Sequence, residues 1–193
     1  MRDWFTNHTS KMFAAHFAPL ADRPIRYLEI GVCQGVSMAW MAENVLKHPD
    51  SRAIGIDFWD MDPQPVRVGM AAIWEKMARE RLAPFSEKVT LLKGRSPDIL
   101  VGLQSGYAES FDIVYIDGDH HLFGVLLDSF LAWRLAKSGA VVVWDDAKMS
   151  AARANDHRPA VKEALEVFLR EYAGRFKWIV NPGLDQVWVR KTT

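Results

Sequence analysis

The chain alternates short apolar runs with helical patterns, and this alternation restricts its possible folds more than any other feature. Five strand-like runs follow one another at the spacing of βαβ units: residues 26–32, 52–58, 88–93, 111–117 and 140–145. Helical patterns lie between them, at residues 36–46, 66–81, 97–103 and 122–137. The runs 113–116 and 141–144 are apolar throughout, as in parallel strands whose two faces are both covered by helices. The pattern therefore predicts an α/β fold with a doubly wound, mostly parallel sheet.

Two further elements flank this core. Residues 1–23 are expected to form an amphipathic helical segment, because five apolar side chains fall on one helical face: Phe5, Met12, Phe13, Phe17 and Leu20. After a further helix, the runs 176–180 and 187–189 alternate in polarity and predict a C-terminal antiparallel hairpin. The complete expectation is a Rossmann-like sheet of seven strands over residues 26–190, within a single domain of residues 1–193.

Composition excludes several kinds of partner. Lys plus Arg and Asp plus Glu each number 24, so no net charge draws the chain to nucleic acid or to an anionic membrane. Cys33 is the only cysteine, which rules out an intrachain disulfide and favours a reducing cytoplasm. No apolar stretch approaches the roughly 18 residues of a membrane span. We expect neither nucleic acid nor membrane as a partner, and the oligomeric state, a homo-oligomer included, stays open.

A glycine-containing turn follows the first strand, in the segment from Glu29 to Gly35. Glycines at such a turn let a ligand approach the backbone closely. Asp57 ends the second strand, where a carboxylate can accept hydrogen bonds from both hydroxyls of a ribose. The dinucleotide fingerprint G-x-G-x-x-G is not met, because Cys33 and Val36 occupy its later glycine positions. The pattern predicts a nucleoside-bearing cofactor, with a plain strand-to-helix turn and an acidic cap as the alternative.

The E-x-G-x-x-x-G pattern resembles the first motif of class I S-adenosylmethionine-dependent methyltransferases. The strand order, the acidic end of the second strand and the terminal hairpin resemble that family too, over residues 27–190. The resemblance implies that five residues contact the cofactor: Glu29, Gly31 and Gly35 at the methionine part, Asp57 at the ribose and Ser96 near the adenine. Ser96 suits a helix N-cap equally well, and the two roles are compatible.

The fourth and fifth strands end in acidic residues, in Asp117-Gly118-Asp119-His120-His121 and in Asp145-Asp146. Because neighbouring strands lie roughly 4.8 Å apart, carboxylates at their ends can converge on one point. They would repel one another there unless a cation lay between them, and hard oxygen ligands suit Mg²⁺ or Mn²⁺. Consecutive strand residues point to opposite faces, so both acids of the second pair reach one metal only if the chain turns at Asp146. A solvated strand end is the alternative interpretation.

These strand ends resemble those of the metal-dependent O-methyltransferases, particularly the macrocin O-methyltransferase group, which acts on sugar or phenolic hydroxyls of natural products. The catechol and caffeoyl-coenzyme A enzymes are more distant relatives. In those enzymes Asn typically stands at the position that Asp146 has in this chain. The resemblance implies that three residues bind Mg²⁺ or Mn²⁺: Asp117, Asp145 and Asp146.

Two residues compete for the role of catalytic base. His120 stands three residues after Asp117, at the spacing of a lysine in the catechol-type enzymes, and an imidazole titrates near neutral pH. Asp119 is the alternative, since some macrocin-like members use an acid at this position. The structural interpretations are a helix N-cap for Asp119 and an exposed first-turn histidine for His120.

Together these features predict methyl transfer from S-adenosylmethionine to a hydroxyl of a small-molecule or sugar acceptor. The loops 59–68 and 147–158 follow strand ends and are expected to contact that acceptor. Three alternatives stay open: a nicotinamide-dependent oxidoreductase, a nucleic-acid base methyltransferase and a non-catalytic S-adenosylmethionine binder. The second of these usually carries an Asn/Asp-Pro-Pro-aromatic motif, which is absent after the fourth strand here.

Overall fold

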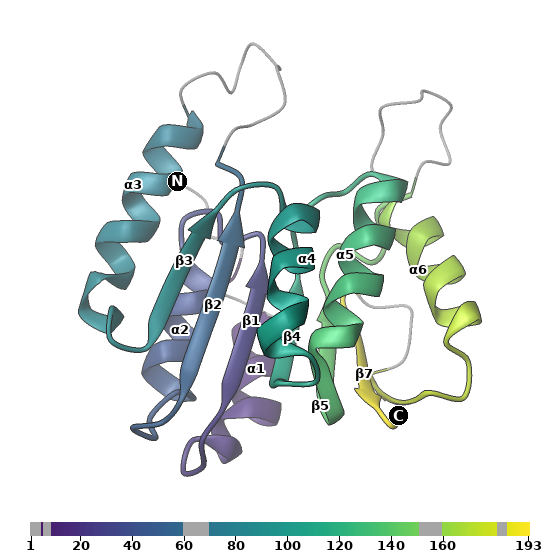
Figure 1. Ribbon diagram of the computed structural model, residues 1–193, viewed down its shortest axis with the longest axis horizontal. Coiled ribbons are helices and arrows are strands. Elements are labelled where there is room, and N and C mark those ends of the chain that lie inside the picture. The colour runs from purple at the N-terminus through teal and green to yellow at the C-terminus, as the bar shows by residue number, and fades with distance from the viewer. Residues whose placement is uncertain (1–4, 6–8, 60–69, 151–159, 181–184) are drawn as a thin grey trace. The chain divides into compact units, whose positions relative to one another are not determined.

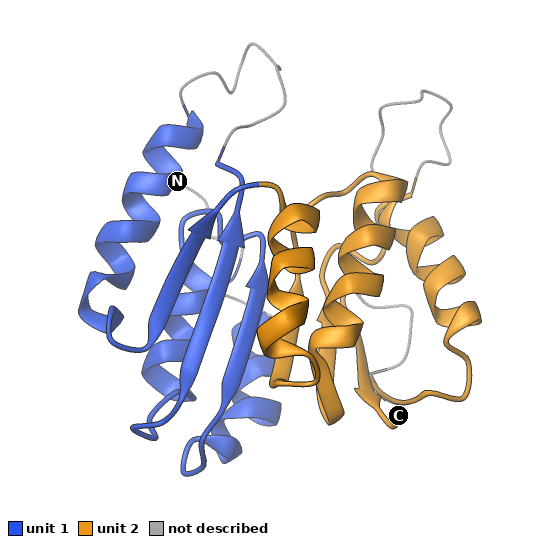
Figure 2. Cartoon of the chain, viewed as in Figure 1, with its two compact units in different colours: residues 1–94 blue, residues 95–193 orange. Residues whose placement is uncertain are grey.

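The computed structural model describes residues 5, 9–59, 70–150, 160–180 and 185–193, and Figure 1 shows their helices and strands. These residues group into two compact units, residues 1–94 and residues 95–193, which Figure 2 distinguishes by colour. Each unit contains its own strands and helices. The expected single domain over the whole chain stays a prediction.

The first unit carries three parallel strands in the order β3-β2-β1. Its elements are α1 (Thr9–Phe17), η1 (Ala18–Leu20), β1 (Arg26–Ile30), α2 (Val36–Asn44), β2 (Arg52–Asp57), α3 (Met70–Leu82), η2 (Ala83–Phe85) and β3 (Val89–Lys93). Ile30 pairs with Ile56, and Asp57 pairs with Lys93, so the three strands end close to one another. This edge of the unit therefore presents the turns that follow β1 and β2.

The N-terminal helix is amphipathic, as predicted. Phe13 and Phe17 of α1 are completely buried, and their rings meet edge to face with centroids 5.1 Å apart. Phe5 adds a second edge-to-face contact with Phe13, and it also packs against Trp40 of α2 at 6.1 Å. These contacts fix the segment against α2 through aromatic burial.

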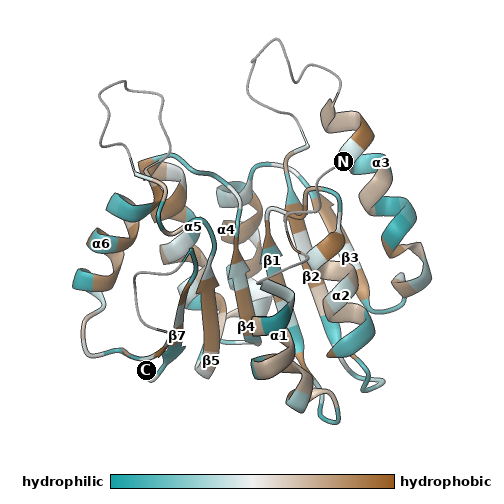
Figure 3. Cartoon of the chain, turned by 180° about the vertical axis from the view of Figure 1, so that it is seen from behind, coloured by the Kyte–Doolittle hydropathy of each residue, from teal (hydrophilic) through white to brown (hydrophobic). Residues whose placement is uncertain are grey.

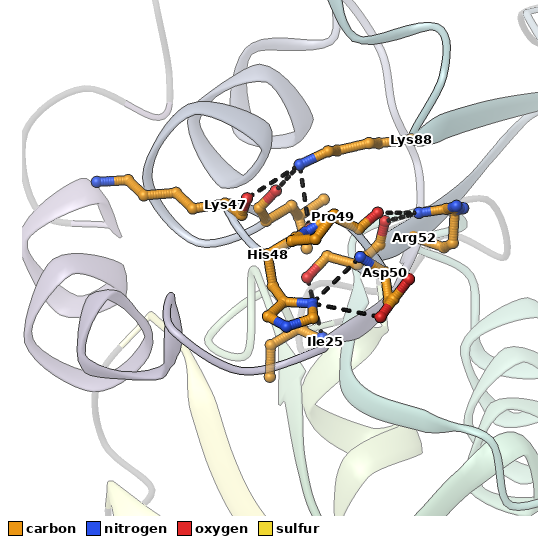
Figure 4. Close-up of polar contacts among 9 residues, drawn as sticks. Ile25, Lys47, His48, Pro49, Asp50, Arg52 and Lys88 are labelled. Atoms are coloured by element: carbon orange, nitrogen blue, oxygen red, sulfur yellow. Dashed lines mark hydrogen bonds and ion pairs between the residues drawn. The ribbon is translucent and has the colours of Figure 1, made fainter.

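A polar network closes the opposite edge of the first unit, where α2 leads into β2 (Figure 4). The Lys88 ammonium donates to three carbonyl oxygens, those of Leu46 at 2.7 Å, Lys47 at 3.2 Å and His48 at 3.1 Å. The His48 ring in turn accepts a hydrogen bond from the Asp50 backbone N–H at 3.1 Å. Carbonyl groups left unpaired at a helix C-terminus need such donors, so His48 and Lys88 have structural roles.

The second unit carries four strands in the order β4-β5-β7-β6. Its elements are α4 (Ser96–Tyr107), β4 (Phe111–Ile116), α5 (Leu122–Leu135), β5 (Ala136–Trp144), α6 (Val161–Glu171), β6 (Phe176–Val180) and β7 (Val187–Lys191). β4 and β5 are parallel, whereas β7 pairs antiparallel with both β5 and β6. The predicted C-terminal hairpin is thus confirmed, and its turn at residues 181–183 lies outside the described residues.

One predicted boundary in this unit is wrong. The helical pattern was expected to continue through Lys137, but α5 ends at Leu135 and β5 begins at Ala136. Ala136 already has extended backbone angles and pairs with Phe111 of β4. Strand pairing therefore ends the helix two residues earlier than its sequence pattern indicates.

Apolar side chains dominate the strands, as the brown colour in Figure 3 shows. In the second unit, Phe168 of α6 is completely buried and lies among the aromatic rings of four other residues: Phe130, Trp133, Trp144 and Tyr172. The expected Rossmann-like α/β fold, with seven mostly parallel strands and an antiparallel pair at the C-terminus, is confirmed. In the part of the chain described here, no helix has the length and apolar character needed to cross a bilayer.

Candidate cofactor and metal sites

The turn after β1 has a backbone that only particular residues can adopt. Gly31, Cys33 and Gly35 have φ angles of 92°, 50° and 75°, all in the left-handed region that favours glycine. Gly35 also lacks space for a side chain, because a Cβ atom there would lie 3.2 Å from the Cα atom of Ala78 in α3. Both conformation and packing therefore require glycine at this position, where α2 begins.

Asp57 connects the end of β2 to this turn. Its Oδ2 accepts a hydrogen bond from the Cys33 backbone N–H, and its Oδ1 accepts one from the Trp59 backbone N–H, both at 2.7 Å. The Trp59 indole closes the circuit by donating to the Cys33 carbonyl at 2.8 Å. Burial raises the pKa of Asp57, and the backbone N–H groups oppose that shift. A carboxylate is an acceptor only, so a ribose hydroxyl that reached Asp57 would donate to it beside these backbone groups.

Glu29 is buried beneath the same turn. Its side chain is completely inaccessible to solvent, and its carboxylate accepts hydrogen bonds from the Tyr27 hydroxyl at 2.7 Å and from the Ser37 hydroxyl. Burial raises the pKa of Glu29 to about 7. The carboxylate thus links β1 to α2, and its predicted contact with the methionine part of a cofactor stays a prediction.

The raised pKa of Glu29 has a measurable consequence for stability. An ordinary glutamate loses its proton near pH 4.5, whereas folded Glu29 keeps it up to about pH 7. Between these values the folded state holds more protons than the unfolded state, so the free energy of unfolding should fall as pH rises. The difference of the two pKa values corresponds to about 3 kcal/mol. Denaturant unfolding at pH 5 and pH 8 should show this loss in the wild type and less of it in Glu29→Gln; an equal slope in both would contradict the assignment.

Ser96, the predicted adenine contact, belongs to the second unit. It is the first residue of α4, and the N-cap position belongs to Arg95, which makes no side-chain capping bond. The Ser96 side chain faces the carboxyl group of Asp128 in α5 and lowers its pKa. The N-cap interpretation of Ser96 is therefore wrong by one position, and its role near an adenine stays a prediction.

Three side chains at the ends of β4 and β5 converge as a metal site would require. Asp117, His120 and Asp146 each offer one ligand atom, and all of these atoms lie within 4.8 Å of one another. The His120 Nε2 atom lies 2.9 Å from Asp146 Oδ2 and 3.9 Å from Asp117 Oδ1. Asp146 has a φ of 53°, so the chain does turn where the sequence required a turn. Two carboxylates and an imidazole fit a divalent cation, and the imidazole favours Mn²⁺ over Mg²⁺.

Asp145 is not part of this group. Its carboxylate accepts hydrogen bonds from the Tyr115 hydroxyl and, at 2.9 Å, from the Asp146 backbone N–H. Burial raises the pKa of Asp145, while Tyr115 and Gln186 oppose the shift through hydrogen bonds. The structure thus brings together two of the three predicted ligands and adds His120, whose signal in the sequence was its spacing from Asp117.

Asp119 makes local contacts at the start of α5. Its Oδ1 lies 2.8 Å from both the backbone nitrogen and the Nδ1 atom of His121. Its carboxylate also covers Gly124, where a Cβ atom would lie only 2.1 Å from Oδ2. Asp119 therefore stabilises the turn before the helix through its contacts with His121. The His120 side chain, between them in the sequence, contacts Asp146 instead.

Comparison with known proteins identifies the family and the fold. A family model described as a methyltransferase domain matches residues 28–147, more than half of the chain. Among curated proteins, none matches the sequence. Solved structures do match, with shared folds across nearly the whole chain.

Three of these structures are informative. An O-methyltransferase from Bacillus cereus, solved with SAH, is 19% identical, with a TM-score of 0.68, over 95% of this chain and 80% of its own. The O-methyltransferase TomG from Streptomyces achromogenes, solved with SAM, is 27% identical, with a TM-score of 0.66, over 95% of this chain and 79% of its own. MycE, from the mycinamycin biosynthetic pathway, was solved with Mg, SAH and mycinamycin VI. It is 19% identical, with a TM-score of 0.64, over 98% of this chain and half of its own length.

The family match and the shared fold confirm the resemblance to class I methyltransferases that the glycine turn and strand order indicated. The match begins in β1 and ends just after Asp146, so it includes every predicted site residue. On this basis, the chain belongs to the methyltransferase domain family.

Proposed function

We propose that this methyltransferase takes its methyl group from S-adenosylmethionine, depends on Mg²⁺ or Mn²⁺, and methylates a hydroxyl of a small molecule or sugar. The observation that carries the proposal is the convergence of Asp117, His120 and Asp146 at the ends of β4 and β5. TomG was solved with SAM, and MycE with Mg, SAH and mycinamycin VI, which supports both the cofactor and the acceptor class. The single cysteine favours a reducing cytoplasm as its location.

The cofactor residues have distinct tasks in this proposal. Gly31 and Gly35 leave the backbone of the turn accessible to the methionine part, and Asp57 accepts hydrogen bonds from the ribose hydroxyls beside those from the Cys33 and Trp59 backbone. Glu29 supports the turn from below through its bonds to β1 and α2. We keep Ser96, at the start of α4, as the residue near the adenine.

The metal residues would hold the cation through carboxylate oxygens of Asp117 and Asp146, with Asp145 as a third ligand, which leaves His120 Nε2 uncoordinated. When bound, the cation supplies Lewis-acid polarisation, which lowers the pKa of the acceptor hydroxyl. His120 would then remove the hydroxyl proton through Nε2, the atom that lies near both carboxylates. Asp119 is the weaker candidate for the base, because its carboxylate is already engaged by His121.

A substitution at Asp57 tests the cofactor assignment. Asp57→Asn keeps the size of the side chain but removes its charge, and it should weaken S-adenosylmethionine binding by roughly ten- to hundredfold, measured by calorimetry. Asp57→Ala should have an equal or larger effect, because it also releases the Cys33 and Trp59 backbone groups.

An analogue separates ribose contact from turn support. If Asp57 contacts the ribose, S-adenosylhomocysteine lacking its 2′-hydroxyl should lose affinity for the wild type and lose much less for Asp57→Asn. If the missing 2′-hydroxyl weakens binding equally in the wild type and in Asp57→Asn, then Asp57 supports the turn without binding the ribose.

A further inference from the structure

Asp128 in α5 is a buried acid that the proposed mechanism does not use. Its side chain is completely inaccessible to solvent. Among the residues that the structure describes, neither of its carboxylate oxygens has a partner in full hydrogen-bond geometry, and no lysine or arginine pairs with it. A buried carboxylate left in this way is costly and rare in proteins, so its presence calls for a role.

Two polar groups from different segments approach this carboxylate. The Ser96 side chain, from the start of α4, and the Asp119 backbone each stabilise its charged form, although burial outweighs them and raises the pKa of Asp128 to about 7. Ser96 is the proposed adenine contact. Asp119 lies in the short loop between Asp117 and His120, the two residues of the proposed metal site that follow β4.

Helix α5 leaves space for the side chain of Asp119. Gly124 lies one turn before Asp128 in α5, and its missing side chain makes the space that Asp119 occupies. The loop therefore rests on α5 at two successive turns, with Gly124 below the Asp119 side chain and Asp128 beside the Asp119 backbone. A functional group held by a rigid helix is positioned more precisely than one held by a loop alone.

We propose that Asp128 is a positioning residue, which holds the Ser96 turn and the loop of residues 117–121 in fixed register on α5. The inference rests on the proposed function, because it takes Asp117 and His120 to be the groups whose placement matters. The observations that support this role are the nearness of the Ser96 side chain and the Asp119 backbone to the Asp128 carboxylate and the placement of the Asp119 side chain over Gly124, one turn earlier in α5. The alternative is that Asp128 is only a tolerated core residue.

The test compares Asp128→Asn with Ser129→Ala. The amide keeps the shape of the carboxylate but turns one acceptor into a donor, which then faces a donor. Ser129 is the next residue along the helix and equally buried, and its hydroxyl bonds to Val125 and Trp144, which belong to neither segment. We expect Asp128→Asn to lower kcat about tenfold and to weaken Mn²⁺ binding, measured by electron paramagnetic resonance. Ser129→Ala should lower the melting temperature and leave both quantities unchanged.

A readout that needs neither metal nor turnover keeps this inference separate from the proposed function. The ring resonances of His120, assigned with His120→Gln, should shift in Asp128→Asn and stay in place in Ser129→Ala. If the wild type binds no Mn²⁺, the proposed function fails, and these spectra still decide whether Asp128 positions the loop.

A second variant applies if Asp128→Asn does not fold. Gly124→Ala displaces Asp119 without altering Asp128, and it should shift the His120 resonances and reduce Mn²⁺ affinity in the same direction. Unchanged His120 resonances in Asp128→Asn, or in Gly124→Ala where that is the variant available, would overturn the proposal.

Discussion

Chelation of divalent cations is expected to abolish methyl transfer by this chain while S-adenosylmethionine stays bound. The proposed metal residues follow β4 and β5, whereas the glycine turn and Asp57 follow β1 and β2, so the two groups share no residue and we expect cofactor binding to persist without the cation. Release of S-adenosylhomocysteine with catechol and glycoside acceptors measures turnover, and calorimetry measures the bound cofactor. Readdition of Mg²⁺ or Mn²⁺ should restore the rate.

Two substitutions sharpen this experiment. Asp146→Ala should act like the chelator, because it removes a carboxylate that lies 2.9 Å from His120. Asp112→Ala is the matched control, since Asp112 is an acid of β4 that pairs with Lys137 and lies outside the site. Full activity of the chelated, metal-free protein would show that the acids are structural.

The identity of the third ligand can be read from the bound Mn²⁺ itself. Electron spin echo measurements detect a coordinating imidazole nitrogen, and such a signal would disappear in His120→Ala. If no nitrogen signal is present in the wild type and Asp145→Ala loses the metal, Asp145 leaves its Tyr115 bond and completes the site.

Replacement of His120 is expected to produce the second large effect. His120→Ala should lower kcat by roughly 10²–10⁴ with little change in cofactor affinity, because a general base contributes that much to proton removal. His121→Ala is the control, since this neighbouring imidazole contacts Asp119 rather than the metal residues. Turnover with and without a large excess of Mn²⁺ separates the two roles of His120. A base that is absent cannot be replaced by more metal, whereas a lost ligand can be compensated.

Asp119→Asn completes the comparison. It keeps the turn at His121 largely intact, because an amide oxygen can still accept from the backbone N–H. We therefore expect a small change in kcat. A large loss in Asp119→Asn beside near-normal turnover in His120→Ala would transfer the role of base to Asp119.

The fold could be predicted from the sequence because its main signals are local. Residues 113–116 of β4 and 141–144 of β5 are apolar on both faces, and the turn from Gly31 to Gly35 has conformations that glycine favours. Such signals depend only on residues that are close in the sequence, so they can be recognised without the tertiary structure. The end of α5 was missed because Ala136 is fixed by pairing with Phe111, a contact that no local pattern reveals.

The site could be predicted only in part, for the same reason. Asp117 and Asp146 follow strands, and their ligand atoms lie within 4.8 Å of each other and of His120. That they bind a metal stays a prediction. The engagement of Asp145 by Tyr115 depends on the register of two strands. The burial of Asp128 could not be predicted, because an acid within a helix is expected to be exposed to solvent until the packing around it is known.

The close packing of Gly35 against α3 gives protein engineers an indirect means of tuning cofactor affinity. The contact surface behind the turn is the backbone and small side chain of Ala78, which is completely buried. A larger residue at Ala78 would push the turn from behind and leave every side chain in front of it unchanged. Selection for altered cofactor preference, for instance toward S-adenosylmethionine analogues with bulkier transferable groups, could therefore begin on a helix that contributes none of the proposed cofactor ligands.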